Sequence, residues 1–455
     1  MVERLVVIGG DAAGMSAASQ ARRRRGPDEL EIVAVERGDF TSYSACGIPY
    51  HVGGDVPELE SLIARDPETF RRDYAIDVRT RTEAVEIDLD GRRVRLRELP
   101  DGPESWLGFD LLMVATGAVP RRPALPGADA RGVFGVQTLN DGVALDSYIA
   151  RERPARAVVV GGGYIGLEMA EAMIRRGLKV DLLEAGEQPM GTLDPDMGAL
   201  VAGAVRGLGV GVHTGERVTG FDTSGDRVTA VRTAAAVYPA DLVVLGLGVR
   251  PNGALAEAAG LTVGETGGVV VDRRMRTTAP GVWSAGDCVE TFHRITGRPV
   301  AIALGTHANK QGRVAGIGIG GGYATFPGVI GTAVTKVCDI QVGRTGLNER
   351  EAERAGFAYV TASVASTTRA GYYPGATEMT TKVIAERRSG RLLGAQIVGE
   401  EGAAKRIDAL AIAVWNEMTV EEMTGLDLGY APPYSPVWDP VLITARKAAE
   451  RLEAG

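Results

Sequence analysis

Cys46 is the residue whose surroundings in the sequence point most directly to chemistry. It lies in a stretch of small and turn-forming residues, 40–50, and glycine, isoleucine and proline follow it. A cysteine acts as a nucleophile in its thiolate form, so its surroundings must lower its pKa. No lysine is close in the sequence, and His51 is the nearest histidine. Pro49 suits the first turn of a helix, and we expect the N-terminus of that helix to stabilise the thiolate.

Cys46 has no second cysteine near it in the sequence. Cys288 and Cys338 lie far away within apolar segments, where we expect buried and unreactive thiols. No C-x-x-C pair occurs and the four histidines are scattered, so the sequence carries no metal-binding signature. With a single cysteine, the oxidised resting state is a mixed disulfide with a small thiol, a persulfide or a sulfenic acid.

The N-terminal residues have the pattern of a nucleotide-binding βαβ unit. A short apolar run at 4–8 predicts a buried parallel strand, the glycine-rich turn 9–14 follows it, and an alanine-rich helix is expected over 15–25. A second strand, 31–36, ends in Glu36. Glycines in such a turn let the backbone approach a diphosphate at the helix N-terminus, and the terminal acid accepts hydrogen bonds from ribose hydroxyls.

This first turn departs from the G-x-G-x-x-G pattern at one position. Asp11 stands where the pattern has its middle glycine, and Gly10 precedes it. We expect Gly10 to relieve the crowding that the larger residue causes.

A second unit matches the same pattern in full. A strand is expected over 157–160, the turn 161–166 fits G-x-G-x-x-G, a helix is expected over 167–176, and a strand over 180–184 ends in an acid. Two such units in one chain predict two bound nucleotides.

The acid of the second unit, Glu184, indicates which nicotinamide cofactor it accepts. A carboxylate bonds an unphosphorylated ribose and repels a 2′-phosphate. The residues after it, Ala185 and Gly186, supply no arginine to neutralise such a phosphate. We therefore expect NADH rather than NADPH.

Three further apolar strands end in small residues. The strand at 111–114 is followed by Ala-Thr-Gly at 115–117, a strand in 241–248 repeats the arrangement, and the strand from 282 ends in Gly286 and Asp287. An acid beside a glycine at a strand end can hold a polyol hydroxyl or cap a helix. Prolines 120, 123 and 126 mark a connector between the two nucleotide units.

The bulk properties limit the class of protein. A length of 455 residues predicts two or three domains. The net charge of −8 and the sequence pI near 5.4 speak against a nucleic-acid-binding protein. The N-terminal apolar run is too short to span a membrane. Few cysteines and no signal peptide predict a cytoplasmic protein.

Together these motifs resemble the flavoprotein disulfide reductases that bind two nucleotides. The resemblance rests on the split first fingerprint, the Ala-Thr-Gly turn, the complete second fingerprint and Ala285-Gly-Asp287. It implies an α/β fold with two Rossmann-like dinucleotide-binding domains, for FAD and NAD, and a C-terminal α+β dimerisation domain. The implied FAD domain covers 1–120 and 250–325, the NAD(P)H domain 121–249 and the dimerisation domain 326–455.

Within this group the chain is similar to the single-cysteine branch, because no second cysteine follows Cys46 at C-x-x-x-x-C spacing. That branch includes coenzyme A disulfide reductase, NADH oxidase, NADH peroxidase and persulfide reductase. Residues 46–50, 371–375 and 430–435 resemble coenzyme A disulfide reductase most. Ala45 stands where those reductases usually have asparagine, so the substrate stays open between coenzyme A disulfide, a persulfide or polysulfide of coenzyme A, and the oxygen or peroxide of a sulfenic-acid enzyme.

The resemblance also implies roles for individual residues. Cys46, Tyr372 and Tyr430 would be catalytic, with the tyrosines, or their neighbours Tyr373 and Tyr434, reaching the cysteine of the other subunit in a homodimer. The substrate, a small coenzyme A-type disulfide, would contact Ser16, Gln20, Arg23 and Asn309. The cofactors FAD and NADH would contact Gly9, Gly10, Ala13, Gly14, Glu36, Arg37, Ser44, Thr116, Gly117, Gly161, Gly163, Tyr164, Ile165, Gly166, Glu184, Gly248, Gly286 and Asp287. Of these, Tyr164 would gate the nicotinamide position, and Glu168 would orient the same pocket.

Overall fold

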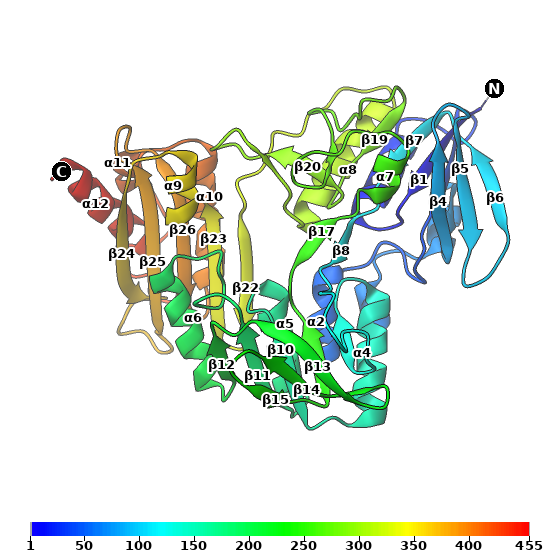
Figure 1. Ribbon diagram of the computed structural model, residues 1–455. Helices are drawn as coiled ribbons and strands as arrows, with labels where there is room; N and C mark the ends of the chain where they lie inside the picture. Colours follow the sequence, from blue (N-terminus) through cyan, green and yellow to red (C-terminus); the bar gives the residue numbers. More distant parts are fainter. Residues whose placement is uncertain (1, 455) are drawn as a thin grey trace. The chain divides into compact units, whose positions relative to one another are not determined.

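The computed structural model describes residues 2–454, which form two compact units (Figure 1). Each unit is assembled from segments that are far apart in the sequence. The first contains the residues up to Arg121, Gly135–Arg153 and Gly248–Val329; the second contains Arg122–Phe134, Pro154–Leu247 and the residues from Ile330 onward.

A five-stranded parallel sheet is the centre of the first unit, in the order β19-β7-β1-β2-β3. Strand β1 has the sequence ERLVVI, and its last four residues are buried, as expected for a strand covered on both faces. The strands are β1 (Glu3–Ile8), β2 (Leu30–Val35), β3 (Ile76–Arg79), β7 (Leu111–Val114) and β19 (Val282–Ser284).

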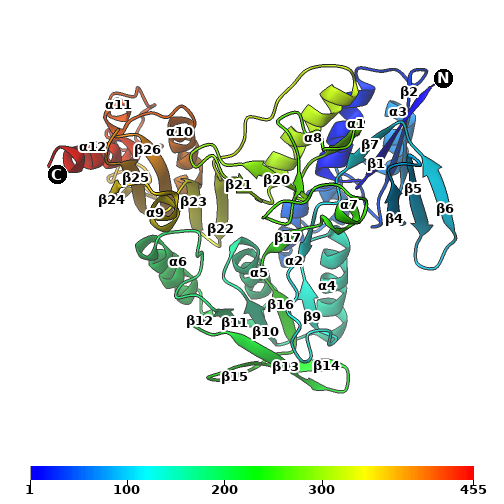
Figure 2. The same cartoon turned by 45° about the horizontal axis from the view of Figure 1, so that its top comes forward.

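Helices α1 (Ala12–Arg22) and α8 (Gly305–Ile319) lie side by side in the first unit (Figure 2). Two glycines of α8 allow the backbones to touch. A Cβ atom on Gly312 would lie 2.2 Å from the Ala13 carbonyl oxygen, and one on Gly316 would lie 2.4 Å from the Ala17 carbonyl oxygen. Any larger side chain at these positions would push the two helices apart.

The remaining elements of the first unit surround this core. An antiparallel sheet contains β4 (Thr82–Asp88), β5 (Arg93–Glu98) and β6 (Glu104–Gly108), and short pairings join β8 (Ala118–Pro120) to β17 (Val249–Pro251) and β20 (Val289–Phe292) to β18 (Val269–Val270) and β21 (Pro299–Val300). The other helices are α2 (Ile48–Gly53), α3 (Pro67–Tyr74), α4 (Leu139–Glu152) and α7 (Ala254–Ala258), with 3-10 turns η1 (Ala45–Gly47) and η2 (Leu59–Leu62).

The second unit contains another five-stranded sheet, in the order β12-β11-β10-β16-β9, with parallel pairing between β12, β11, β10 and β16. Its strands are β9 (Val133–Gly135), β10 (Arg156–Val160), β11 (Lys179–Glu184), β12 (Gly211–Thr214) and β16 (Leu242–Leu245). Helices α5 (Tyr164–Arg175) and α6 (Pro195–Gly207) and the antiparallel strands β13 (Val218–Ser224), β14 (Arg227–Thr233) and β15 (Val237–Pro239) belong to the same unit.

The C-terminal part of the second unit is an antiparallel sheet with helices, in the order β22-β23-β26-β25-β24. Its strands are β22 (Ala333–Val337), β23 (Ile340–Gly346), β24 (Tyr359–Thr367), β25 (Glu378–Glu386) and β26 (Leu392–Gly399). The helices are α9 (Glu349–Ala355), α10 (Ala403–Trp415), α11 (Val420–Thr424) and α12 (Pro440–Glu453).

Both predicted fingerprint helices exist, but each begins three residues earlier than predicted. The helices expected over 15–25 and 167–176 span Ala12–Arg22 and Tyr164–Arg175. The last residues of each glycine turn already form the first helical turn, so the backbone N–H groups after the turn point along the helix axis.

Lys382 joins the antiparallel sheet to the start of α6. Its side chain is 5% exposed, and its ammonium lies 3.2 Å from Asp194, 2.7 Å from Asp196 and 2.5 Å from Glu349. Asp194 is also buried and accepts a hydrogen bond from Gln396 at 2.7 Å. A buried cation that balances several carboxylates is costly to remove, because the carboxylates remain without compensation.

We predict that Lys382→Met destabilises the second unit. The loss of the central cation should lower the midpoint of thermal unfolding by roughly 5–10 °C. The matched control is Lys405→Met, because Lys405 forms an ion pair with Asp408 at 2.5 Å but is 82% exposed; such surface pairs contribute little. Equal unfolding midpoints for the two variants, measured by calorimetry, would contradict the prediction.

Candidate active site

The ends of three strands bring the first set of predicted residues together. In a parallel sheet the carboxyl ends of the strands meet at one edge, where ligands bind. Gly9 follows β1 with φ +108°, and a Cβ there would lie 2.0 Å from the carbonyl oxygen of Ala115, which follows β7. Gly286 follows β19, and a Cβ there would lie 2.8 Å from the Cβ of Ala13. The fingerprint, the Ala-Thr-Gly turn and the Gly-Asp turn therefore form one site.

Glu36 is fixed at the end of β2 by two backbone donors. Its Oε2 accepts a hydrogen bond from the N–H of Gly10 at 2.9 Å, and its Oε1 accepts one from Gly38 at 2.7 Å. A Cβ on Gly10 would lie 2.8 Å from the Glu36 Cβ, so the glycine at this position makes room for the acid. Arg37, the next residue, is exposed. The carboxylate lies at the end of β2 beside the glycine turn, as the βαβ pattern predicts; its role toward a ribose stays a prediction.

Asp11 is the N-cap residue of α1. Its Oδ1 accepts a hydrogen bond from the N–H of Tyr43 at 3.2 Å, and no side-chain cap bond to α1 is formed. Burial raises the pKa of Asp11 to about 7, and the negative charges of Glu36 and Asp287 act in the same direction.

The cysteine loop is joined to the fingerprint turn through its backbone. The N–H of Ser42 donates to the Gly10 carbonyl at 2.9 Å, and the hydroxyl of buried Thr41 donates to the same carbonyl. Further along, the N–H of Ser44 donates to the Leu62 carbonyl at 2.8 Å. Cys46 follows in η1 with an exposed side chain. The loop that carries Cys46 is therefore anchored to the fingerprint turn at Ser42 and Thr41.

Helix α2 begins at Ile48, two residues after Cys46, with Gly47 as its N-cap and Pro49 in its first turn, as predicted. Ile48 is buried, and a Cβ on Gly142 of α4 would lie 2.8 Å from its Cγ2, so α2 packs closely on α4. The Nδ1 atom of His51 lies 2.7 Å from the Val56 carbonyl oxygen, which orients this ring along its own loop. The helix N-terminus is thus the feature closest to Cys46 in sequence that favours a thiolate.

Two residues that the sequence did not suggest hold the edge of this site in place. The side chain of Gln311, 2% exposed, accepts a hydrogen bond from the N–H of Gly286 at 2.8 Å. Asn252 accepts a bond from the Thr116 hydroxyl at 2.6 Å and donates to the Gly117 carbonyl at 2.9 Å. In the sequence, Gln311 could have been noticed because it directly precedes Gly312, the glycine of α8 that packs on α1.

Asp287 and Gly117 fit a bound flavin nucleotide. Burial raises the pKa of Asp287 to about 6, and a backbone hydrogen bond from Leu304 opposes the shift. Gly117 has φ +68°, and a Cβ there would meet no atom within 4 Å. FAD needs three features at this edge of the sheet. They are glycines that form a tight turn, open space beside that turn, and acids that bind hydroxyl groups.

The predicted substrate residues Ser16 and Asn309 are in direct contact. The Ser16 hydroxyl donates to Asn309 Oδ1 at 2.7 Å, and Asn309 Nδ2 donates to the Gly305 carbonyl at 2.9 Å. Gln20 is half-buried beside α8, where a Cβ on Gly316 would lie 2.8 Å from its own Cβ. Arg23 is exposed and follows the last residue of α1. All four thus lie on the α1 and α8 pair; their roles toward a substrate stay predictions.

The second fingerprint repeats the arrangement of the first. Glu184 Oε2 accepts a hydrogen bond from the Gly162 N–H at 2.7 Å, and its Oε1 accepts one from Gly186 at 2.7 Å. A Cβ on Gly166 would lie 1.9 Å from the Gly161 carbonyl oxygen, so this close packing needs a glycine. At Gly163, the N-cap of α5, a Cβ would meet nothing within 4 Å. This open approach to a helix N-terminus fits the diphosphate of a nicotinamide nucleotide.

Tyr164 and Glu168 lie on the first turns of α5, and Ile165 between them is half-buried. The Tyr164 hydroxyl is buried; burial raises its pKa, and a hydrogen bond with the Thr192 side chain opposes this rise. Glu168 accepts a hydrogen bond from the Thr335 hydroxyl at 2.7 Å, and burial raises its pKa too. Gly248 belongs to the first unit, with φ +74° and open space at its Cβ.

Tyr372 and Tyr430 meet in the C-terminal part of the second unit. A hydrogen bond between their side chains raises the pKa of Tyr430. Their exposed fractions are 77% and 48%, and Tyr434 and Trp438 nearby in the sequence are exposed as well. The contact joins the two tyrosines predicted to be catalytic, while their role toward Cys46 stays a prediction.

One prediction about the other cysteines is confirmed and one is wrong. Cys288 is fully buried, and burial raises its pKa. Cys338 is half-buried in the turn between β22 and β23, with φ +51°, rather than buried in a strand. The apolar run ends at Val337, and the turn begins there. The N–H of Cys338 donates to buried Glu171 at 2.8 Å, which fixes the turn to α5.

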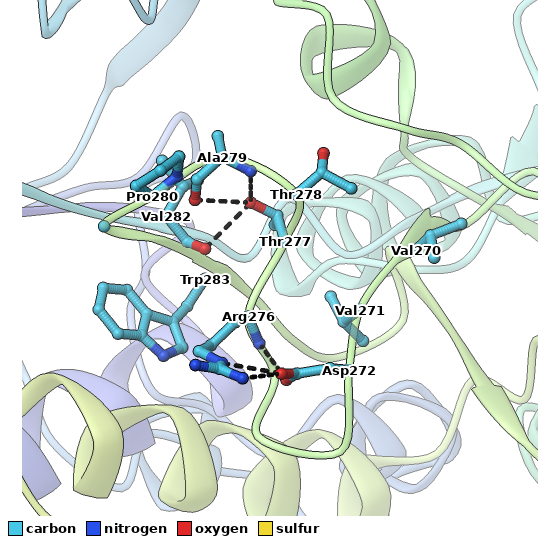
Figure 3. Close-up of a pocket in the computed structure, with 11 residues that line it drawn as sticks. Val270, Val271, Asp272, Arg276, Thr277, Thr278, Ala279, Pro280, Val282 and Trp283 are labelled. Carbon is cyan, nitrogen blue, oxygen red and sulfur yellow. Dashed lines mark hydrogen bonds and ion pairs between the residues drawn. The ribbon is translucent and has the colours of Figure 1, made fainter.

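A hollow of about 760 Å³ lies elsewhere in the first unit, along residues 270–283 (Figure 3). Asp272 and Arg276 form an ion pair at 2.6 Å on one side of it, and Trp283 lies next to them. None of the predicted site residues lines this hollow. Within residues 2–454, no group of three or more metal-ligating side chains is arranged around a common point, and no helix is long and apolar enough to cross a membrane.

Comparison with known proteins agrees with this geometry. The model of the pyridine nucleotide-disulphide oxidoreductase family matches residues 3–312, and the model of its dimerisation domain matches residues 332–440. An NAD(P)H sulfur oxidoreductase (CoA-dependent) of Pyrococcus abyssi is 41% identical over 97% of both chains. A coenzyme A disulfide reductase of Staphylococcus haemolyticus is 28% identical over 99% of this chain and all of the other.

Among solved structures, an NAD-dependent persulfide reductase from A. fulgidus superposes with a TM-score of 0.96 at 41% identity. The match covers 99% of this chain and 84% of that one. These findings confirm the predicted fold class, with Rossmann-type domains and a C-terminal dimerisation domain. The chain belongs to the pyridine nucleotide-disulphide oxidoreductase family, and it is a flavin-dependent NAD(P)H oxidoreductase.

Proposed function

We propose that the protein reduces a sulfur–sulfur bond of a coenzyme A-type substrate with electrons from NADH, through FAD and Cys46. The observation that carries the proposal is the exposed thiol of Cys46, held by backbone hydrogen bonds beside the nucleotide-binding turn. No partner cysteine follows it at the spacing of an internal disulfide. A thiol so placed must form its oxidised state with a substrate sulfur or with oxygen.

The reaction of a disulfide RSSR would begin with the Cys46 thiolate. It attacks one sulfur, forms Cys46–S–SR and releases RS⁻, which takes a proton to become RSH. FAD, when bound, accepts hydride from NADH and supplies the two electrons that cleave the mixed disulfide. The second RS⁻ then leaves and is protonated, so that NADH, one proton and RSSR give NAD⁺ and two RSH. Cys46 returns to the thiolate that started the cycle.

The surrounding residues would position and protonate these groups. Tyr430, hydrogen-bonded to Tyr372, would donate a proton to the leaving thiolate, from the other subunit of a homodimer. Ser16, Gln20, Arg23 and Asn309 would bind the substrate, since a guanidinium suits a diphosphate. We also propose the three functional regions predicted from the sequence: FAD domain 1–120 and 250–325, NAD(P)H domain 121–249 and dimerisation domain 326–455. The scarcity of cysteine supports a reducing, cytoplasmic setting.

A persulfide of coenzyme A is the second candidate substrate. The relatives named for sulfur or persulfide reduction are 38–41% identical to this chain, against 28% for the coenzyme A disulfide reductase of Staphylococcus haemolyticus. Attack of Cys46 on the sulfur bonded to coenzyme A would release hydrosulfide and give the same mixed disulfide. The two activities therefore differ in the first leaving group and share every later step.

We expect Cys46→Ser to abolish the release of thiol or sulfide. The serine hydroxyl cannot form the mixed disulfide, so turnover should fall at least about 1,000-fold. Reduction of the bound flavin by NADH should persist, because the nucleotide sites are unchanged. The assay is anaerobic release of thiol from coenzyme A disulfide and of sulfide from coenzyme A persulfide. Cys338→Ser, which changes a half-buried thiol outside these sites, should behave like the wild type; thiol release at the wild-type rate by Cys46→Ser would refute the proposal.

The product that forms faster identifies the substrate. If coenzyme A persulfide is the substrate, kcat/KM for sulfide release should exceed that for thiol release from the disulfide, and the reverse holds if the disulfide is the substrate. Mass spectrometry of the intact protein provides an independent result. A coenzyme A adduct on Cys46 supports either activity, whereas one added oxygen together with rapid oxygen consumption and no thiol release would indicate an oxidase or peroxidase instead.

We expect Glu184 to set the preference for NADH. Its carboxylate should repel the 2′-phosphate of NADPH, so Glu184→Gln, which keeps an acceptor oxygen, should lower the ratio of kcat/KM for NADH over NADPH. A loss of about tenfold corresponds to about 1.4 kcal/mol. Glu187→Gln removes an exposed acid three residues later and is the matched control. An unchanged ratio in Glu184→Gln would show that Glu184 does not discriminate between NADH and NADPH.

A further inference from the structure

Asp11 puts a carboxyl group where the nucleotide-binding turn should accept negative charge. It occupies the position of the middle fingerprint glycine, the residue that lets the backbone approach a diphosphate. It is also the N-cap of α1, whose N-terminus favours an anion. An ionised side chain at this position would repel the phosphates of FAD.

Other acids already surround this carboxyl. Glu36 at the end of β2 and Asp287 after β19 both act on Asp11 electrostatically. Tyr43, from the cysteine loop, donates its backbone N–H to Asp11 at 3.2 Å, and the backbone N–H of Ala12 is a second donor; both bonds oppose the rise in the pKa of Asp11. Binding of FAD would add a diphosphate to this group of negative charges. In a buried site, like charges this close favour the neutral form of one member.

We propose that Asp11 is protonated when FAD is bound, so that FAD binding takes up a proton and the affinity for FAD falls as the pH rises above neutral. The inference rests on the proposed use of FAD. A neutral carboxyl keeps its carbonyl oxygen for the Tyr43 N–H and offers an O–H that can donate to a phosphate oxygen. The aspartate thus replaces the missing glycine with a hydrogen-bond donor and ties the cysteine loop to the same turn.

The direction of the pH effect follows from linkage. Burial raises the pKa of Asp11 to about 7 in the free protein, and the phosphates of FAD would raise this pKa further. Below that value both states are protonated and the affinity is constant. Above it, the free protein loses a proton that the complex retains, and the dissociation constant rises with pH.

The groups facing Asp11 could titrate in its place, and they act differently. Burial raises the pKa of Asp287 to about 6, so its titration would appear about one pH unit lower. Burial also raises the pKa of Tyr43, which keeps this phenol neutral throughout the neutral range. The Glu36 carboxylate accepts hydrogen bonds from the backbone N–H groups of Gly10 and Gly38. The variant Asp287→Asn therefore distinguishes titration of Asp11 from titration of Asp287, the competing carboxyl.

The test is the equilibrium dissociation of FAD from diluted holoenzyme, followed by the fluorescence of the released cofactor from pH 6 to pH 8.5. The wild type should bind FAD about tenfold more weakly at pH 8 than at pH 6. Asp11→Asn, which keeps the carbonyl acceptor for Tyr43 but cannot ionise, should change less than about twofold over this range. Asp287→Asn, which also removes a predicted FAD contact, should bind FAD more weakly at every pH but keep a fall in affinity with pH, at a slightly lower midpoint because the Asp287 charge no longer raises the pKa of Asp11.

An infrared difference spectrum supplies a second readout. At pH 7.5 the holoenzyme should show the carbonyl band of a protonated carboxylic acid that is absent from Asp11→Asn. A pH-independent affinity in the wild type, the same dependence in Asp11→Asn, or its loss in Asp287→Asn alone would overturn the inference. A protein that binds no FAD at any pH would instead refute the proposed function.

Discussion

The structure of the active site depends on one carbonyl group, that of Gly10. It lies in the turn that binds the nucleotide, and it accepts hydrogen bonds from the Ser42 N–H at 2.9 Å and from the Thr41 hydroxyl. Backbone groups that are buried must be paired, so the cysteine loop cannot move without breaking these bonds. The start of the loop that carries Cys46 is therefore fixed to the fingerprint turn, which we propose binds FAD.

The two glycine-turn sites hold their acidic residue with the same hydrogen-bond geometry. In each, an acid at the end of the second strand accepts one bond from the glycine turn and one from the backbone two residues further on: Glu36 bonds to Gly10 and Gly38, and Glu184 bonds to Gly162 and Gly186. These bonds hold each carboxylate in place before a ribose arrives. Less conformational freedom is then lost on binding, which increases affinity.

The sequence was sufficient for features that depend on short-range patterns. Glycine spacing and a terminal acid identified both βαβ units, and Pro49 marked the helix after Cys46. Contacts between distant residues could not be predicted in this way. The bond from Tyr43 to Asp11 joins residues 32 apart and depends on the path of the loop, and Gln311 acts on Gly286 from a different helix. Cys338 was misplaced because an apolar run does not reveal where a turn with positive φ begins.

The contact between Ser16 and Asn309 limits how the substrate can be recognised. Both ends of the Asn309 amide are already engaged, the oxygen by Ser16 and the nitrogen by Gly305. A substrate that bonds to this amide by replacing Ser16 would exchange one hydrogen bond for another, with little net gain. Ala45 offers no polar side-chain atom in compensation. Under the proposed function, affinity for a coenzyme A-type molecule would therefore come mainly from charge, with Arg23 at the exposed end of α1 meeting phosphate and Cys46 reacting with the sulfur.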